Sequence, residues 1–348
     1  MPDLGEELVE AIFRKLQVDE EWATRAERGF SWIAHRLEQS VWASKPIEDD
    51  GYTLFRLCAE TVVVDSVSAP EATIDRLLSN LNRHSFGSCY IYDPATRRIF
   101  ATTSTWVHQE VAGLRFELLH PCIIGQLCFA EAEADFLADK ACGTVASRDH
   151  GISGRRRNPD DMLNVVGELV VSTGQEASRY QNAFEFDAVA DVAKRSESVA
   201  TLGGSAGGIS LECSFASGTA IAILRSTERH RLLGSGLYVT LHLPIPITPE
   251  DGYRISAMLN RRERSTDMPG GPGHLGAWCV HPQPVEGIAV TYRRFLPNFM
   301  YAGGLIMDTA IGCIGQMRRV DRIMNFSPTK ESPWQHLRRR LGLLSRED

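Results

Sequence analysis

The sequence predicts an α+β protein made of two tandem α-βββ-α-ββ-α units with antiparallel sheets. The chain has 348 residues, more than a single hydrophobic core usually supports, so two domains are expected. Its apolar residues alternate between stretches of helical spacing and stretches of strand spacing. The same order of elements occurs twice, at an offset of about 180 residues, and Pro70-Glu71 then matches Pro249-Glu250 and Leu81-Asn82 matches Leu259-Asn260. Such a duplication would make the chain a pseudo-dimer.

The first unit is assigned to residues 1–142, and its first 40 residues have helical spacing. One apolar set recurs every four residues from Leu4 to Leu16, and a second set runs from Trp22 through Phe30 and Ile33 to Leu37. We therefore expect two amphipathic helices, or one broken helix. The next stretch has strand spacing and predicts three short antiparallel strands at 40–43, 52–58 and 61–64. The Asp49-Asp50-Gly51 turn and Glu60 separate them.

The rest of the first unit contains a helix, a hairpin and a closing helix. A helix is predicted to begin at Ser68-Ala-Pro70-Glu71, where Ser caps and Pro fits the first turn. The Asp93 to Thr96 segment favours a hairpin turn, because Asp and Pro both favour turns. A closing helix is expected over 116–140, with a start after Pro121 as the alternative.

A polar, glycine-rich segment over residues 143–161 predicts a linker, and the second unit is assigned to 162–325. Helix is expected over 162–194 with a break near Gly174. The remaining elements are three strands, a helix opened by Thr248, a hairpin around Pro282-Gln-Pro and an apolar helix. Their ranges are 210–215, 219–224, 237–242, 248–259, 275–280 with 287–292, and 297–320. Residues 326–348 form a basic amphipathic tail.

Composition and charge narrow the functional classes. The chain is 43% hydrophobic and 23% charged, as is usual for soluble globular proteins, and this excludes collagenous, coiled-coil and disordered chains. The net charge of −7 provides no global positive field, so nucleic-acid binding is not expected. The acidic first residues lack the positive charge of a secretory signal, and the eight cysteines are too sparse for a disulfide framework. We therefore expect a cytoplasmic protein.

Three stretches bear on whether the chain holds a metal ion or spans a membrane. The Cys and His groupings at 120–128 and at Cys279 and His281 lack the paired spacing of a tetrahedral zinc site. The apolar run 299–317 has nearly the length of a membrane span, but Asp308 at its centre costs about 2.5 to 3.5 kcal/mol of insertion free energy. No metal site and no membrane span are therefore expected, although membrane contact by this run stays open.

One glycine-rich string raises the possibility of catalysis. Gly203 to Gly207 spells Gly-x-Ser-x-Gly, the nucleophile elbow of serine hydrolases, with Ser205 as the nucleophile. An elbow needs a strand before the serine and a helix after it, whereas a strand pattern follows here. We expect a Gly-Ser connector between helix and sheet, and keep a serine hydrolase as the alternative. The same glycines lack the Lys and Ser/Thr of a phosphate loop.

Three arginine clusters could grip phosphate or an anionic surface. A regulator that associates with membranes or nucleic acid through them is therefore the other alternative. Because the clusters are dispersed along an acidic chain, we expect a solvated surface or an interface instead. The clusters are Arg155-Arg156-Arg157, Arg261-Arg262 with Arg264, and Arg338-Arg339-Arg340.

The element order over 40–142 and 205–320, with the Pro70-Glu71 and Pro249-Glu250 helix starts, resembles the fold of type III secretion chaperones and of YbjN-like proteins, including tandem actinobacterial forms. That resemblance implies a non-enzymatic binder that holds a polypeptide client on a sheet or helix surface. Members of the family work as dimers, and the duplication within this chain would replace the dimer. We therefore predict a chaperone-like or adaptor module whose partner is a polypeptide. We assign no catalytic, cofactor-binding or metal-binding residue.

Overall fold

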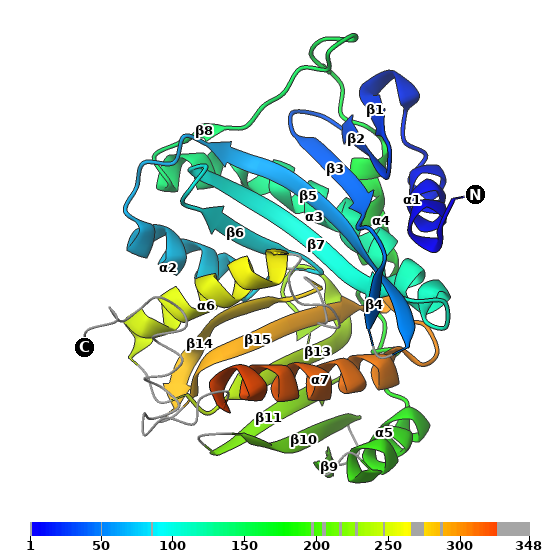
Figure 1. Cartoon of the computed structure of the whole chain (residues 1–348), viewed down its shortest axis with the longest axis vertical. Coiled ribbons are helices and arrows are strands. Elements are labelled where there is room, and N and C mark those ends of the chain that lie inside the picture. The colour runs from blue at the N-terminus through cyan, green and yellow to red at the C-terminus, as the bar shows by residue number, and fades with distance from the viewer. Residues whose placement is uncertain are drawn as a thin grey trace.

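The predicted fold class is confirmed by the computed structural model, in which two antiparallel sheets each carry helices against one face (Figure 1). We call residues 2–142 lobe 1 and residues 162–325 lobe 2. The described residues are 2–325 except 50, 85, 196–197, 204–206, 216–217, 227–228, 246–247, 266–274 and 286–287. The tail at 326–348, with its arginine cluster, therefore lies outside them.

Lobe 1 has a sheet with the strand order β1-β2-β3-β5-β7-β6, and β4 also pairs with β5. Helix α3 covers one face, and α1 packs at the β2, β3 and β5 end. The capping box formed by Asp3 and Glu6 begins α1. The elements are α1 (Leu4–Lys15), a 3-10 turn (Glu20–Trp22), β1 (Ala23–Ala26), β2 (Gly29–Ile33), β3 (Glu38–Ala43), β4 (Ile47–Asp49), β5 (Tyr52–Asp65), α2 (Glu71–Asn82), β6 (Cys89–Asp93), β7 (Arg98–Val107) and α3 (Ala112–Lys140).

The prediction of helix up to residue 40 is wrong beyond α1. The residues from Trp22 to Leu37 form a 3-10 turn and the hairpin β1–β2, in which Ala26 pairs with Gly29. In β2 the buried side chains of Phe30 and Trp32 alternate with Ser31, so strand spacing and the adjacent Gly29 decide the conformation. The helical spacing of the apolar residues between Trp22 and Leu37 is therefore coincidental.

The strands predicted at 52–58 and 61–64 are one continuous strand, β5. Glu60 does not end it, because its carboxylate forms an ion pair with Arg264 of lobe 2 at 2.7 Å. The Asp49 to Gly51 turn is confirmed, with Gly51 at φ +82°. The helix after Pro70 and the hairpin closed by Asp93 are also confirmed, but Ser68 does not cap α2.

Helix α3 begins at Ala112, so the expected start at 116 and the alternative after Pro121 are both wrong. Pro121 lies inside the helix, and the predicted end at Lys140 is correct. The segment 143–161 then runs along lobe 1, where its short strand β8 (Thr144–Val145) pairs with β5 and its Asp160 is buried.

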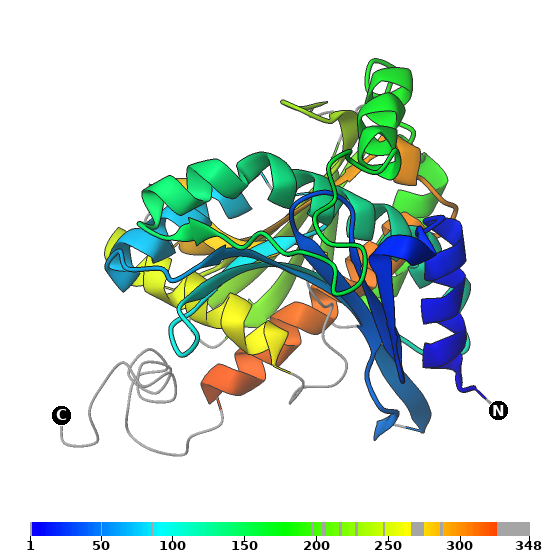
Figure 2. The ribbon, with the colours of Figure 1, turned by 90° about the horizontal axis from the view of Figure 1, so that it is seen from above.

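Lobe 2 repeats this plan with the strand order β14-β15-β13-β11-β10-β9, and α7 covers one face of the sheet. Figure 2 shows α3 and α7 on opposite sides of the molecule. The elements are α4 (Met162–Thr173), α5 (Ala183–Arg195), β9 (Val199–Gly203), β10 (Gly208–Phe215), β11 (Gly218–Arg225), β12 (Arg229–His230), β13 (Gly234–Leu243), α6 (Pro249–Arg264), β14 (Ala277–Val285), β15 (Ile288–Pro297), a 3-10 turn (Asn298–Met300) and α7 (Leu305–Asn325).

Most elements of lobe 2 match the sequence-based expectations, including the break at Gly174, which caps α4. Three details differ. Strands β9 and β12 were not predicted. Strand β14 continues through Pro282 and Pro284 to Val285, so the hairpin turn comes later than expected. Helix α7 begins at Leu305 rather than at 297, after a 3-10 turn and Gly304 at φ +84°.

The matched pair Asn82 and Asn260 occupies equivalent places in the two lobes. The Asn82 side chain accepts a hydrogen bond from the Tyr90 backbone at 2.8 Å and donates one to its carbonyl at 3.0 Å. The Asn260 side chain does the same for Trp278, at 2.8 and 2.9 Å. Each amide therefore takes the place of a neighbouring strand along the edge of β6 or β14. Equal strand orders and equal edge caps support the duplication.

The lobes share one continuous hydrophobic core and meet at α2, α6, β6 and β14. Helix α6 of lobe 2 ends against the sheet of lobe 1, which we call sheet 1, as the sheet of lobe 2 is called sheet 2. There the buried Arg56 donates hydrogen bonds to the last carbonyls of α6 and the residue after it, those of Glu263, Arg264 and Ser265. Helix α2 reaches across to sheet 2, where His230 contacts the His84 carbonyl at 3.2 Å. Each middle helix therefore ends against the sheet of the other lobe.

Candidate functional site

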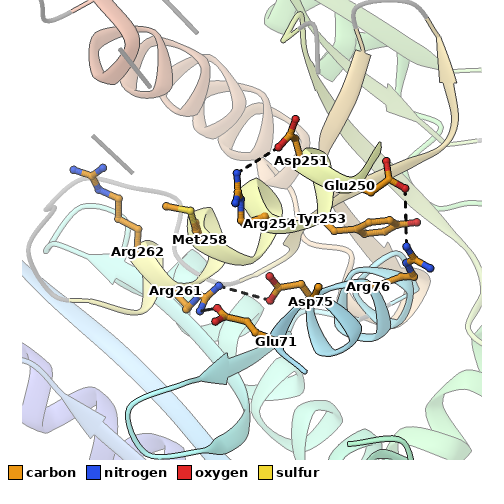
Figure 3. Close-up of a pocket in the computed structure, with 11 residues that line it drawn as sticks. Glu71, Asp75, Arg76, Glu250, Asp251, Tyr253, Arg254, Met258, Arg261 and Arg262 are labelled. Carbon is orange, nitrogen blue, oxygen red and sulfur yellow. Dashed lines mark hydrogen bonds and ion pairs between the residues drawn. The ribbon is translucent and has the colours of Figure 1, made fainter. Parts of the chain in front are cut away.

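A groove of about 860 Å³ lies between α2 and α6 (Figure 3). Arg261 of α6 lies 2.7 Å from Glu71 and 3.6 Å from Asp75 of α2, and Arg76 lies 4.0 Å from Glu250. The lining residues carry four guanidinium and four carboxyl groups, so the groove has no net charge at neutral pH when all are ionised. Its side chains largely join the two lobes.

Asp75 is the most perturbed carboxyl group of this groove. It is 3% exposed, and burial raises its pKa to about 7, although the nearby Arg261 favours the ionised form. Its Oδ1 accepts no hydrogen bond from the described residues. The described lining residues of this groove include no serine, cysteine or histidine, whereas an adjoining small pocket places Asp75 in the same lining as Ser79 and Ser256.

A second surface, which we call the β9 edge, consists of β9; helix α5, which carries Phe184, packs against this strand. Strand β9 ends sheet 2 and pairs only with β10 among the described strands, so its outer backbone groups can accept another strand. Val199 is 62% exposed, Leu202 47% and Phe184 79%. Strand β9 has the sequence Val-Ala-Thr-Leu-Gly and carries no charge.

The equivalent strand of lobe 1, β1, is also largely exposed, but it carries a charge and contacts another segment of the chain. Its Arg25 forms an ion pair with Glu10 at 2.8 Å and lies over the Phe13 ring. Segment 143–161 also contacts this end of lobe 1, since Ser153 donates a hydrogen bond to the Glu21 carbonyl and His150 lies 3.4 Å from the Thr24 hydroxyl. Charge and cover are the usual protections of an edge strand, and the β9 edge shows neither among the described residues.

The Gly-x-Ser-x-Gly string connects β9 to β10, which run antiparallel. Ser205 itself lies outside the described residues. The expected connector between helix and sheet is therefore a connector between two strands, and a strand leaves it where an elbow would require a helix.

Three of the six arginines in the two described clusters, Arg156, Arg261 and Arg264, form side-chain hydrogen bonds or ion pairs within the chain. The Arg264 guanidinium binds both Glu60 oxygens, at 2.7 and 2.8 Å, and lies over the Phe100 ring. Arg156 donates to the Ile33 carbonyl and to Asp160, at 2.9 and 3.0 Å. These guanidinium groups brace the fold.

The cysteines are all free thiols, and only Cys142 is exposed. Cys122 and Cys279 are fully buried, and burial raises the pKa of both thiols. Within the described part of the chain, no group of three or more His, Cys, Asp or Glu side chains is placed to hold a metal ion. No helix described is long and apolar enough to cross a membrane.

Neither surface was predicted from the sequence as a site. The groove needs α2 and α6 side by side, and only tertiary structure supplies that. A signal for the β9 edge existed in the uncharged stretch Val199–Gly203, which is five residues long and contains two exposed apolar residues. Comparison of the chain with family models, curated proteins and solved structures finds no match.

Proposed function

We propose that the protein is a non-enzymatic polypeptide-binding module, chaperone-like or adaptor-like, which takes up an extended segment of its client at the β9 edge. The observation that carries this proposal is an uncharged edge strand with exposed apolar side chains, which pairs on one side only among the described strands and lies next to helix α5 with its exposed Phe184. An extended peptide that adds to such an edge gains main-chain hydrogen bonds, and its apolar side chains gain contacts.

The matching client segment is uncharged and extended, with apolar residues at alternate positions. Along β9, Leu202 pairs opposite the buried Ile209 and Ala200 opposite the buried Leu211, so this face continues the apolar face of sheet 2. An added strand would extend that face by one position and could place an apolar residue near Leu202. The free thiols and the resemblance to secretion chaperones support a cytoplasmic chaperone role.

The test uses a permanently unfolded polypeptide, reduced and carboxymethylated α-lactalbumin, and measures binding by fluorescence anisotropy. The double variant Val199→Lys, Leu202→Lys should weaken binding at least tenfold, since charge on an edge opposes strand addition. Ile152→Lys is the matched control, because Ile152 is 94% exposed but lies in the segment 143–161. It should bind like the wild type. Backbone amides of β9 should also exchange more slowly in the complex.

Two outcomes would overturn the proposal. The first is absence of binding by the wild type, or equal binding by the double variant. The second is covalent labelling by a fluorophosphonate that disappears in Ser205→Ala, because it would establish a serine hydrolase instead.

A further inference from the structure

A small cavity of about 20 Å³ lies between α7 and the strands β13 and β15 of lobe 2. Lobe 1 contributes Arg115, from the first turn of α3. Its Nη2 donates to Asp308 Oδ1 of α7 at 2.7 Å, and its Nη1 donates to Thr105 at 3.3 Å. The cavity therefore lies where the two lobes meet, and residues of both line it.

One guanidinium group that lines the cavity is buried, and two of its nitrogen atoms lack a hydrogen-bond partner among the described residues. Arg294 of β15 is 5% exposed, and neither its Nε nor its Nη2 has a hydrogen-bond partner among the described residues. Arg115 Nε, Thr309 Oγ1, Tyr292 Oη and Asp308 Oδ2, which belong to the same lining, are also buried without a partner among the described residues. A buried cation without partners costs several kcal/mol, so such groups are nearly always satisfied by an ion or by ordered water.

The balance of charge and of donors identifies the missing partner. Arg115 and Arg294 carry two positive charges, and Asp308 supplies one negative charge among the lining residues. Glu263 lies beyond the lining, where its Oε1 accepts hydrogen bonds from Trp278 and Gln316. One positive charge is therefore left in the cavity wall. The unpartnered guanidinium nitrogens, Arg294 Nε, Arg294 Nη2 and Arg115 Nε, carry four N–H groups that can only donate, against one unpartnered carboxylate oxygen, Asp308 Oδ2. A water molecule accepts about two hydrogen bonds, whereas an anion can accept from all three nitrogens.

We propose that this cavity binds one small monovalent anion of the size of chloride, held by the guanidinium groups of Arg294 and Arg115 and by the Thr309 hydroxyl. The volume agrees with a single small species, because one water-sized sphere needs about 10 to 15 Å³ on this measure. The anion joins the lobes, since Arg115 belongs to lobe 1 and the other two residues to lobe 2. This inference is independent of the β9 edge.

The test measures the thermal unfolding midpoint in sodium chloride and in sodium gluconate at equal ionic strength, because gluconate is too large for the cavity. The midpoint of the wild type should rise with chloride and reach a plateau, as expected for a ligand that binds only the folded state. Arg294→Met should unfold at the same temperature in both salts. Arg14→Met removes the same charge from a side chain that is 77% exposed, and should keep the chloride dependence.

Equal midpoints of the wild type in both salts would overturn the proposal, and so would an Arg294→Met variant that keeps the chloride effect. If that variant does not fold, the wild type still decides the question. Crystals soaked in sodium bromide should show an anomalous peak in the cavity, and a cavity that holds only water in those crystals would refute the anion site.

Discussion

Replacing Asn82 or Asn260 by alanine should destabilise the protein strongly and by similar amounts. The two side chains are 1% and 2% exposed, and each makes two hydrogen bonds to the backbone of one edge residue, Tyr90 or Trp278. Alanine leaves a buried N–H and a buried C=O without these partners, at a cost of about 1 to 3 kcal/mol each. We therefore expect a loss of about 2 to 6 kcal/mol in the free energy of unfolding for either variant.

The assay is urea unfolding followed by far-UV circular dichroism and by tryptophan fluorescence. Because the lobes share one core, both probes should report a single transition, and either substitution should shift it. The exposed Asn164, on α4, provides the control, since its replacement by alanine should change the free energy by less than about 0.5 kcal/mol. The reasoning fails if either core variant unfolds within that margin of the wild type, or if one costs several times as much as the other.

Three further predictions concern Arg56 and Asp75, which lie where the two lobes meet, and the exposed thiol of Cys142. Arg56→Met removes the guanidinium group that donates hydrogen bonds to the last carbonyls of α6. It should lower the free energy of unfolding, measured in urea, by about 2 to 5 kcal/mol. An unchanged midpoint of the urea transition would mean that these contacts are not formed. Burial raises the pKa of Asp75 to about 7, so the folded state holds a proton that the unfolded state releases near pH 4. The free energy of unfolding should therefore fall from pH 4 to pH 7, with a slope of at most about 1.4 kcal/mol per pH unit. Asp75→Asn should remove that contribution. Iodoacetamide should alkylate the exposed Cys142 first in the native protein, and mass spectrometry of Cys142→Ser should show that fast addition lost.

Local signals identified most helices and hairpins of this fold. The Thr248 cap of α6 and the break at Gly174 depend on neighbouring residues, so they could be predicted. The failures involve partners distant in the chain. Glu60 looked like the end of a strand because its partner, Arg264, follows about two hundred residues later. The coincidental helical spacing of Trp22 to Leu37 hid a hairpin that sheet pairing stabilises.

The candidate sites were less predictable than the fold, for a related reason. The groove between α2 and α6 and the cavity lined by Arg115 and Arg294 are made of residues from both lobes. No local pattern in the sequence indicates which helices meet. The sequence shows the arginine cluster of α6, but it could not show that Arg264 binds Glu60. Only the β9 edge could have been found locally.

The unequal edges of the two sheets have a consequence for stoichiometry. A symmetric homodimer presents every surface twice, so it can bind two copies of a partner or gain avidity by holding one partner at two equivalent sites. In this chain β1 carries the charged Arg25 and contacts segment 143–161 through Thr24 and His150, whereas β9 is uncharged and pairs on one side only among the described strands. Joining the two units in one chain allows them to differ in this way. A partner that adds a strand to β9 should therefore bind one per chain, with an affinity determined by that edge alone.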